Sequence, residues 1–205
     1  TVLSATGTKH RHLGVSGEAE LSGKGVSYCP TCDGFFFRNK TVCVIGGGDS
    51  AATAAVYLAD ICQKVYLIVR EREMIAEKFW QNLLAKKPNV EILYEANVKE
   101  ITGEFKVESV LLDRDYQGKN SLATDGVFIE IGLLPNTNFL ASLGVELDAY
   151  GYVKVSADQS TAVKGIWAAG DATTGSNFFR QIVTAASEGA IAANSILQYL
   201  QQSEG

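Results

Sequence analysis

Cysteine and proline are scarce in this sequence, and long apolar runs are missing. The 205 residues include 4 Cys and 3 Pro. Four Cys are too few for a disulfide framework in a chain of this length, so we expect a cytoplasmic protein whose paired thiols serve redox chemistry. No apolar run approaches the roughly 18 residues that a spanning helix needs, and no secretory pattern opens the chain. We therefore predict no membrane partner.

Positive charge is in deficit as well. Lys and Arg number 18 against 23 Asp and Glu, which leaves a formal net charge of −5 and a pI near 5.1. A protein that binds nucleic acid in general or a membrane surface would need a basic face. Hydrophobic residues make up 46%, which is typical of a globular chain with one large domain or two small ones.

The beginning of the chain lacks an initiator Met and opens inside an apolar run, Val2–Ala5. We interpret this run as the end of a strand rather than a natural protein start. A polar loop follows, in which His10 and His12 have a spacing that can bind metal from a strand. A solvated loop is the favoured interpretation, because no third His or carboxylate lies nearby in sequence, and we predict no metal site.

A thiol pair is the first chemical feature that is present, at Cys29 and Cys32. Pro30 suits the first position of a helix, which would put Cys29 at the helix N-terminus, where the dipole favours the reactive thiolate. A zinc half-site and an inert pair are the alternatives. Zinc usually needs a second close pair, and neither Cys43 nor Cys62 supplies one. The pair therefore favours redox use.

A glycine-rich turn between two buried strands is the clearest supersecondary unit. Thr41–Ile45 is apolar on both faces, as a parallel strand should be. We predict a helix from the turn to about Asp60 and a second strand at Val65–Val69. The inward positions of this helix are Ala52, Ala55, Val56 and Ala59.

The small residues of this turn have distinct tasks in dinucleotide binding. Gly46 allows the tight turn, Gly48 lets the backbone approach a pyrophosphate, and Ala51 lets the helix pack on the strand. The helix N-terminus then holds the phosphates. The predicted binding residues are Gly46, Gly47, Gly48, Asp49, Ser50 and Ala51.

The end of the second strand selects the ribose. An acid there favours a 2′-OH and an Arg favours a 2′-phosphate. Both kinds are present, with Arg70 and Arg72 beside Glu71 and Glu73, and mixed surface charge is a further interpretation. The residues leave NADH and NADPH open, with Arg70 and Glu71 as the candidates for this contact.

The remaining segments predict more α/β structure. We expect a helix at Glu77–Lys87, with Phe79, Leu83 and Leu84 as its apolar stripe, and a turn at Gly118–Ser121. Expected strands are 90–94, 97–102, 109–114 and 127–131. Gly132–Thr137 breaks the last strand and predicts one hinge, and Leu13–Gly17 predicts another, so residues 12–131 form an inserted domain.

The C-terminal flank ends on a strand and a long helix. Expected elements are a short helix at 139–143, strands at 152–155 and 165–169, and a helix from about Gln181 to Gln201. Gly170 and Asp171 follow the last strand, where an Asp can accept a hydrogen bond from a ribityl hydroxyl; a turn with a helix cap is the alternative. The helix N-terminus at 180–182 can face a flavin.

Several motifs in this order resemble low-molecular-weight thioredoxin reductases and the related flavoprotein subunit of alkyl hydroperoxide reductase. The motifs are Ala5-Thr6-Gly7, Cys29-Pro30-Thr31-Cys32-Asp33-Gly34-Phe35-Phe36, Val44-Ile45-Gly46-Gly47-Gly48-Asp49-Ser50-Ala51, Ile131-Gly132-x-x-Pro135-Asn136-Thr137, and Ala168-Ala169-Gly170-Asp171 with Arg180-Gln181. The resemblance covers essentially the whole chain.

This resemblance implies an α/β fold in which a Rossmann-like NAD(P)-binding domain, with a parallel sheet and a small antiparallel sheet, is inserted into a second, FAD-binding Rossmann-like domain. Residues 1–11 and 132–205 are the expected FAD-domain parts, and 12–131 the NAD(P) domain. The first FAD-binding unit of the family is missing, so the chain resembles a truncated form. The cofactor contacts that the resemblance adds are Thr6, Gly7, Ile131, Gly132, Gly170, Asp171, Arg180, Gln181 and Ile182.

The resemblance also implies a function: electrons pass from NAD(P)H through FAD and the Cys pair to thioredoxin or a similar small dithiol protein. Cys32 would face the flavin, Cys29 would exchange with the protein substrate, and Asp33 would be the acid or base. The domain would rotate about the two hinges, and the family suggests a homodimer. Of the family's NADPH-binding positions this chain keeps only Arg70, with Ile75 at the last, which weakens the NADPH assignment and leaves NADH, use of both nucleotides and a different donor open. A peroxiredoxin-linked reductase and a non-catalytic nucleotide-binding module are the alternatives.

Overall fold

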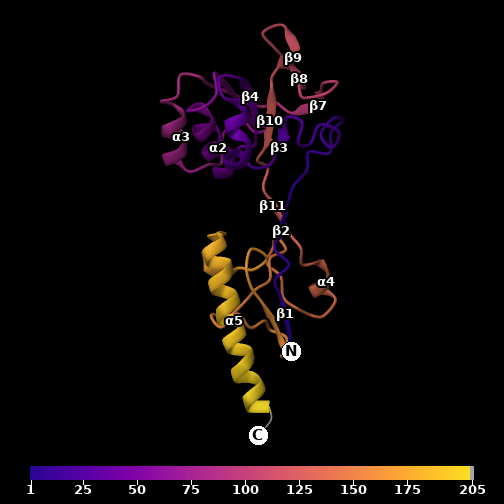
Figure 1. Cartoon of the computed structure of the whole chain (residues 1–205), viewed down its shortest axis with the longest axis vertical. Coiled ribbons are helices and arrows are strands. Elements are labelled where there is room, and N and C mark those ends of the chain that lie inside the picture. The colour runs from indigo at the N-terminus through magenta and orange to yellow at the C-terminus, as the bar shows by residue number, and fades with distance from the viewer. Residues whose placement is uncertain (204–205) are drawn as a thin grey trace. The chain divides into compact units, whose positions relative to one another are not determined.

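The structure, a computed structural model, describes residues 1–203 and divides into two compact units (Figure 1). Unit 1 consists of Thr1–Lys9 and the residues from Leu133 onward, and unit 2 is His10–Gly132. The chain therefore enters unit 2 once and returns once. Among residues 1–203, no helix has both the length and the apolar character that crossing a membrane requires.

A five-stranded parallel sheet is the centre of unit 2. Its strands, in spatial order, are β3 (Val26–Ser27), β10 (Gly126–Ile129), β4 (Thr41–Ile45), β5 (Lys64–Ile68) and β6 (Val90–Leu93). Strand β4 lies in the middle of the sheet, and its side chains from Val42 to Ile45 are buried. The predicted buried parallel strand is thus confirmed, because only a strand covered on both faces has use for an uninterrupted apolar run.

Alternate side chains of this sheet enter two different cores. Val42 and Val44 pack with Leu58 and other residues of α2 (Asp49–Ala59), and α3 (Lys78–Leu84) lies beside α2 (Figure 1). Cys43 and Ile45 face the opposite way, toward a second buried cluster. The period of two along β4 therefore divides the interior of unit 2 into a helical layer and a β layer.

The β layer is a small antiparallel sheet of β7 (Val98–Thr102), β8 (Ser109–Tyr116) and β9 (Lys119–Ala123). Its apolar residues complete the second cluster. The expected turn at 118–121 is wrong at its end, because β9 already begins at Lys119. The turn lies at Gln117 and Gly118, whose φ angles are 52° and 80°. The α/β class with both sheets is confirmed.

The helix expected at 77–87 is shorter, and its apolar stripe is partly wrong. Glu77 caps α3, which ends at Leu84, and only Leu84 of the three stripe residues is buried. Phe79 is 60% exposed, while the neighbouring Trp80 packs against the first core cluster. A helix of two turns presents few side chains to the core, so one aromatic ring packs against the core and its neighbour stays at the surface.

Unit 1 is built on β1 (Val2–Ser4) and β12 (Ile166–Ala168), which pair in parallel. Its other elements are β11 (Leu133–Pro135), paired with β2 (Thr8–His10), α4 (Asn138–Ala141), the 3-10 turn η2 (Gly175–Phe178) and α5 (Ile182–Ser203). Trp167 of β12 is buried with Ala169 and Ala192.

Two expectations for unit 1 are wrong. Residues 152–155 do not form a strand, since Val153 makes only isolated bridges to Leu147 and Thr173. Lys9 and His10, expected in a polar loop, lie in β2. Strand β2 pairs with β11, more than 120 residues further along the chain, and Val153 makes single bridges in place of a ladder. Local patterning reveals neither feature.

Candidate functional site

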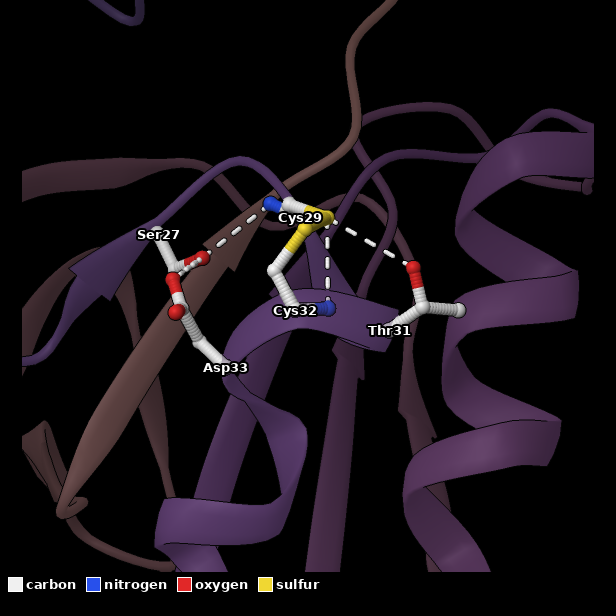
Figure 2. Close-up of a disulfide and its surroundings, with 5 residues drawn as sticks. All are labelled: Ser27, Cys29, Thr31, Cys32 and Asp33. Atoms are coloured by element: carbon white, nitrogen blue, oxygen red, sulfur yellow. Dashed lines mark hydrogen bonds between the residues drawn. A yellow bond between two sulfur atoms is a disulfide. The ribbon is translucent and has the colours of Figure 1, made fainter. Parts of the chain in front are cut away.

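The two cysteines of the CxxC motif form a disulfide at the start of a short helix (Figure 2). Helix α1 (Pro30–Asp33) has Pro30 in its first turn and Cys29 as its N-cap, as the sequence predicted. Cys29 Sγ accepts a hydrogen bond from Cys32 N at 3.2 Å. Cys29 is half-buried and Cys32 is exposed. The disulfide is therefore held at the start of a one-turn helix, with Cys32 accessible from solvent.

A carboxylate and a hydroxyl lie beside the disulfide. Asp33 Oδ2 accepts a hydrogen bond of 2.6 Å from Ser27 Oγ, and Ser27 Oγ accepts one of 3.0 Å from Cys29 N (Figure 2). These contacts connect the end of β3 to both ends of α1. The sequence identified Asp33 but not Ser27, which was one more polar residue before the motif.

Two exposed aromatic side chains follow the disulfide directly. Phe35 and Phe36, in the 3-10 turn η1 (Gly34–Phe37), are 65% and 72% exposed. The third phenylalanine of this turn, Phe37, is buried against Phe128. Large apolar groups exposed together commonly mark a protein contact, so these two rings are a candidate contact surface close in sequence to the disulfide.

The other two cysteines are buried and unpaired. Burial raises the pKa of the Cys43 thiol to about 12, and a hydrogen bond with Thr124 offsets only part of this rise. Burial, together with the charge of Asp125, raises the pKa of Cys62 to about 11. Neither thiol is a ready nucleophile. Within the described part of the chain, no cluster of His, Cys, Asp and Glu could hold a metal ion.

A buried carboxylate, Glu18, organises the segment before the thiol pair. It accepts hydrogen bonds from Leu13 N, Gly14 N and the hydroxyl of Tyr28, and His12 Nδ1 lies 2.8 Å from the same hydroxyl. Burial raises the pKa of Glu18, but the hydrogen bonds outweigh it and the net shift is downward. Burial and then Glu18 raise the pKa of Tyr28. The sequence did not reveal this network, in which the partners of His12 are Glu18 and the hydroxyl of Tyr28.

The glycine-rich turn joins β4 to α2 in the predicted manner. Gly46 has φ +144°, and a Cβ there would lie 2.2 Å from the carbonyl oxygen of Glu130 and 2.9 Å from Ala51 Cβ. Gly48 is the N-cap of α2 and makes no side-chain capping bond. A Cβ built on Gly48 would meet only Ile75, at 4.0 Å. The turn therefore offers free space above backbone N–H groups, which suits a diphosphate.

The loop after β5 folds back over this turn. Ile75 N and Ala76 N donate to the carbonyl of Gly47, and Asp49 Oδ1 accepts from Glu77 N. Asp49 is thus occupied with the loop, whereas Ser50 is an exposed residue in the first turn of α2. The six residues predicted to hold a dinucleotide lie together at the carboxyl end of β4, where open α/β sheets bind ligands.

The candidate ribose contacts lie at the carboxyl end of the neighbouring strand. Arg70 forms an ion pair with Glu71, whose Oε1 is 2.8 Å from Nη2, and Arg72 pairs with Glu95 at 2.9 Å. All four side chains are exposed. Both guanidinium groups that could attract a 2′-phosphate thus already have a carboxylate partner.

A cavity of about 420 Å³ lies in unit 1 beside the start of α5. Its lining residues are Ala5, Gly7, Ala169, Gly170, Asp171, Arg180, Gln181, Ile182, Ala185 and Gly189. Six predicted contact residues are therefore brought together from both ends of the chain. Thr6 points elsewhere, with its hydroxyl bonded to the carbonyl of Asn136. Ile131 and Gly132 belong to unit 2.

Contacts that the sequence did not reveal hold the loop around Asp171. Glu188, 4% exposed on α5, accepts hydrogen bonds from Gly170 N, Thr173 Oγ1 and Ser176 Oγ at 2.8, 3.1 and 2.5 Å. Arg180 stacks over the ring of Tyr152 at 4.1 Å. In the sequence, Glu188 cannot be told from an acidic residue on the surface of a helix. Its burial and its hydrogen-bond partners are known only from the three-dimensional structure.

These features fit a flavin and a nicotinamide dinucleotide as far as the described residues go. The cavity is small-residue-lined, with a carboxylate and a helix start at its edge, and the turn at Gly46 tolerates no side chain. A parallel sheet with a dinucleotide-type turn, an accessible disulfide on a helix start and a separate cavity in unit 1 is the set of features typical of nucleotide-dependent disulfide oxidoreductases.

Comparison with known proteins identifies the family within that class. The family model described as "Pyridine nucleotide-disulphide oxidoreductase" matches residues 1–189, so the chain belongs to this family. The predicted resemblance is thereby confirmed, since the curated relatives include thioredoxin reductases.

Three similar proteins illustrate the match. The thioredoxin reductase of Treponema pallidum (strain Nichols) is 42% identical over 98% of this chain and 64% of its own length. An NADH dehydrogenase of Ferdinandcohnia aciditolerans is 40% identical over 98% of this chain and 38% of its own. The crystal structure of Lactococcus lactis thioredoxin reductase, 36% identical, superimposes with a TM-score of 0.80 over 98% of this chain and 66% of that one. The chain thus spans less than two thirds of each.

Proposed function

We propose that the protein carrying this chain is a flavin-dependent disulfide reductase of the thioredoxin reductase type. The observation that carries the proposal is the Cys29–Cys32 disulfide at the start of α1, in a unit with a dinucleotide-type turn at Gly46. Neither a nucleotide sensor nor a purely structural domain needs a solvent-accessible disulfide of this kind. The relatives named thioredoxin reductase support the same activity.

In this proposal each residue of the disulfide site has one role. Cys29 exchanges with the disulfide of the protein substrate, Cys32 exchanges with the flavin side, and Asp33 supplies or takes the proton of the leaving thiolate. Asp33 suits this task because it is half-buried beside the pair and held by Ser27.

The cofactors we propose are FAD and a nicotinamide dinucleotide. Bound FAD would accept a hydride from the reduced nicotinamide and supply two electrons to the disulfide. For FAD, Asp171 would accept from a hydroxyl of the ligand, and the start of α5 at Gln181 and Ile182 would face its polar edge; both line the cavity of unit 1. For the nicotinamide dinucleotide, Gly48 and the first turn of α2 would bind the phosphates.

We further propose NADH as the preferred electron donor. Arg70 and Arg72 are each paired with a carboxylate, so a 2′-phosphate would have to displace Glu71 or Glu95 to reach either one. Ile75, 83% exposed beside Gly48, adds no charge. The relative named NADH dehydrogenase is in accord with this donor.

The partner we propose is thioredoxin or a similar small dithiol protein. Phe35 and Phe36 offer it an apolar surface next to the disulfide. The two buried thiols and the single accessible pair suit a reducing, cytoplasmic setting. We also propose that the protein is a homodimer, as its family resemblance implies.

A trapping experiment in the intact protein tests the assignment. With Cys32→Ser, the remaining Cys29 should hold a thioredoxin-type substrate as a mixed disulfide that is visible by non-reducing electrophoresis. With Cys29→Ser, no covalent complex should form, and NADH-dependent disulfide reduction should fall at least about 10³-fold, since the nucleophile is gone. Undiminished turnover of Cys29→Ser would show that the assignment is wrong and would leave a nucleotide-binding module.

A further inference from the structure

Ser27 occupies an unusual place for a small polar residue. It is the last residue of β3, pairs with Phe128 in the sheet, and is 5% exposed. Its side chain nevertheless lies two residues before the disulfide and touches both Cys29 and Asp33 (Figure 2). A buried hydroxyl in this position has to find partners, and both of its partners belong to the redox site.

The two hydrogen bonds of Ser27 have a fixed direction. A hydroxyl has one proton and two lone pairs. Because Cys29 N–H can only donate, Ser27 Oγ accepts there, and its single proton goes to Asp33 Oδ2 at 2.6 Å. That length is typical of a hydroxyl donating to an ionised carboxylate. No other side chain among residues 1–203 has a hydrogen bond to Asp33, so Ser27 alone orients it.

The same contact can reverse without movement of either side chain. If Asp33 Oδ2 gains a proton, it becomes the donor and Ser27 Oγ accepts through its second lone pair. Cys29 N–H stays bonded to the same oxygen in both arrangements. The hydroxyl therefore keeps Asp33 in place before and after a proton transfer, which a residue with donors only, such as Lys, could not do.

We propose that Ser27 is a positioning residue for thiol–disulfide exchange at Cys29–Cys32 and acts through Asp33. This inference rests on the proposed function only for the identity of Asp33 as the proton carrier. When a dithiol reduces the pair, the Cys29–Cys32 bond breaks and a disulfide forms in the reductant. Two electrons pass to the pair, and the two protons given up by the reductant's thiols balance those taken up by Cys29 and Cys32.

Within that exchange, the ionised Asp33 takes a proton from the attacking thiol of the reductant and gives it to a leaving thiolate, so the carboxylate ends in the form in which it began. The position of Asp33 decides how fast this proton moves, because general acid catalysis requires hydrogen-bond reach. Without the Ser27 hydroxyl, the carboxylate is free to turn toward solvent, and the exchange slows.

The test is the rate at which dithiothreitol reduces the Cys29–Cys32 bond in the 205-residue chain, followed by quenched alkylation and mass spectrometry. It needs no flavin or nicotinamide. Ser27→Ala and Asp33→Asn should each slow the reaction at least about tenfold. The double variant should be no slower than Asp33→Asn alone, because a residue that acts through Asp33 has nothing left to position. Ser22→Ala, an exposed serine before β3, is the matched control and should react as the unchanged chain does.

Two outcomes would overturn the proposal. One is a Ser27→Ala rate within twofold of the unchanged chain. The other is a double variant slowed by the product of the single effects, which would indicate a structural role independent of Asp33. If Ser27→Ala does not fold by circular dichroism, Ser27→Thr decides: it keeps the hydroxyl and must stay within about threefold of the unchanged rate. Failure here leaves the reductase proposal intact, because trapping by Cys32→Ser measures that separately.

Discussion

Glu130 shows how a single side chain responds to its place beside the glycine-rich turn. It follows β10, and its carbonyl oxygen lies next to Gly46. Burial raises the pKa of its carboxyl to about 7. The folded chain therefore binds more protons than the unfolded chain between about pH 4.5 and 7, and stability falls as the pH rises through this window.

We expect Glu130→Gln to remove this pH dependence. Below about pH 4 the variant and the unchanged chain should have similar free energies of unfolding, since Glu130 is then mostly protonated in both the folded and the unfolded state. Above pH 7 the variant should be more stable by about 1–2 kcal/mol, after allowance for the partial exposure of the carboxyl. Urea unfolding at both pH values measures this. Glu104→Gln, at an exposed turn, is the control; parallel curves for Glu130→Gln and the unchanged chain would contradict the expectation.

Glu71 is the residue at which donor preference can be shifted. Glu71→Arg removes the partner of Arg70 and places a second cation at the end of β5. The ratio of the NADPH to the NADH dissociation constant should fall at least about tenfold, because a 2′-phosphate gains two charge-assisted partners. Isothermal titration of both nucleotides gives this ratio. Glu73→Arg, without an ion pair to Arg70, is a charge-matched comparison, and an unchanged ratio for Glu71→Arg would count against NADH selection at this site.

At the scale of elements, the turn between β4 and α2 separates folding from binding. Gly46→Ala places a methyl group 2.2 Å from a backbone oxygen at a positive φ, so it should lower the free energy of unfolding by at least about 2 kcal/mol. Gly48→Ala meets nothing closer than Ile75 at 4.0 Å and should change stability by less than about 0.5 kcal/mol. Nucleotide affinity should fall for Gly48→Ala nonetheless, if a diphosphate approaches the backbone there.

Thermal melts and nucleotide titrations of the two variants distinguish these effects. A stable Gly46→Ala protein would mean that the turn can relax away from Glu130. Full nucleotide affinity in Gly48→Ala would place the phosphates elsewhere than above the α2 N-terminus.

The elements of unit 2 were predictable where one local pattern determines them. The apolar run at 41–45, the small residues after it and the proline inside the thiol pair specify a strand, a turn and a helix start with little help from the rest of the chain. Phe79 was not predictable in this way, because its neighbour Trp80 is the ring that packs against the core and Phe79 is exposed. Residues 152–155 failed as a strand because Val153 alone pairs, through single bridges to Leu147 and Thr173.

The candidate sites divide in the same manner. The residue types and spacing in the sequence were enough to predict Cys29, Cys32 and Gly46 as site residues. Ser27 and Glu188 do not, since what matters is which donors and acceptors the fold brings to their buried oxygens. Serine and glutamate are common everywhere, and only three-dimensional contacts separate these two from the others.

At the scale of the whole molecule, the two units differ in how well each encloses its own apolar surface. Residues 10–132 contain both large core clusters. In unit 1, a two-stranded parallel sheet leaves Val2 53% exposed, and Ile182 at the start of α5 is 92% exposed. Parallel sheets are normally covered on both faces, so we expect unit 1 to be the less stable of the two units.

We therefore expect residues 10–132 to fold when expressed alone. Urea unfolding followed by circular dichroism should show one cooperative transition, and the fragment should still form the Cys29–Cys32 disulfide. Residues 133–203 expressed alone should show no cooperative transition, because half of the β1–β12 pair is absent. A non-cooperative 10–132 fragment would mean that its two cores depend on unit 1.

The two ends of unit 2 meet in one hydrogen bond, from Arg11 N to the carbonyl of Gly132, at 3.0 Å. A polypeptide whose entrance and exit coincide can be transplanted as a cassette. Spliced into a surface turn of an unrelated host, residues 10–132 would not force the flanking host residues apart, and the graft would carry its own disulfide with it. Insertion of one gene segment into another gene would assemble a two-unit protein from separate ancestors in this way. Such an assembly needs one insertion, whereas joining the pieces end to end needs two separate fusions.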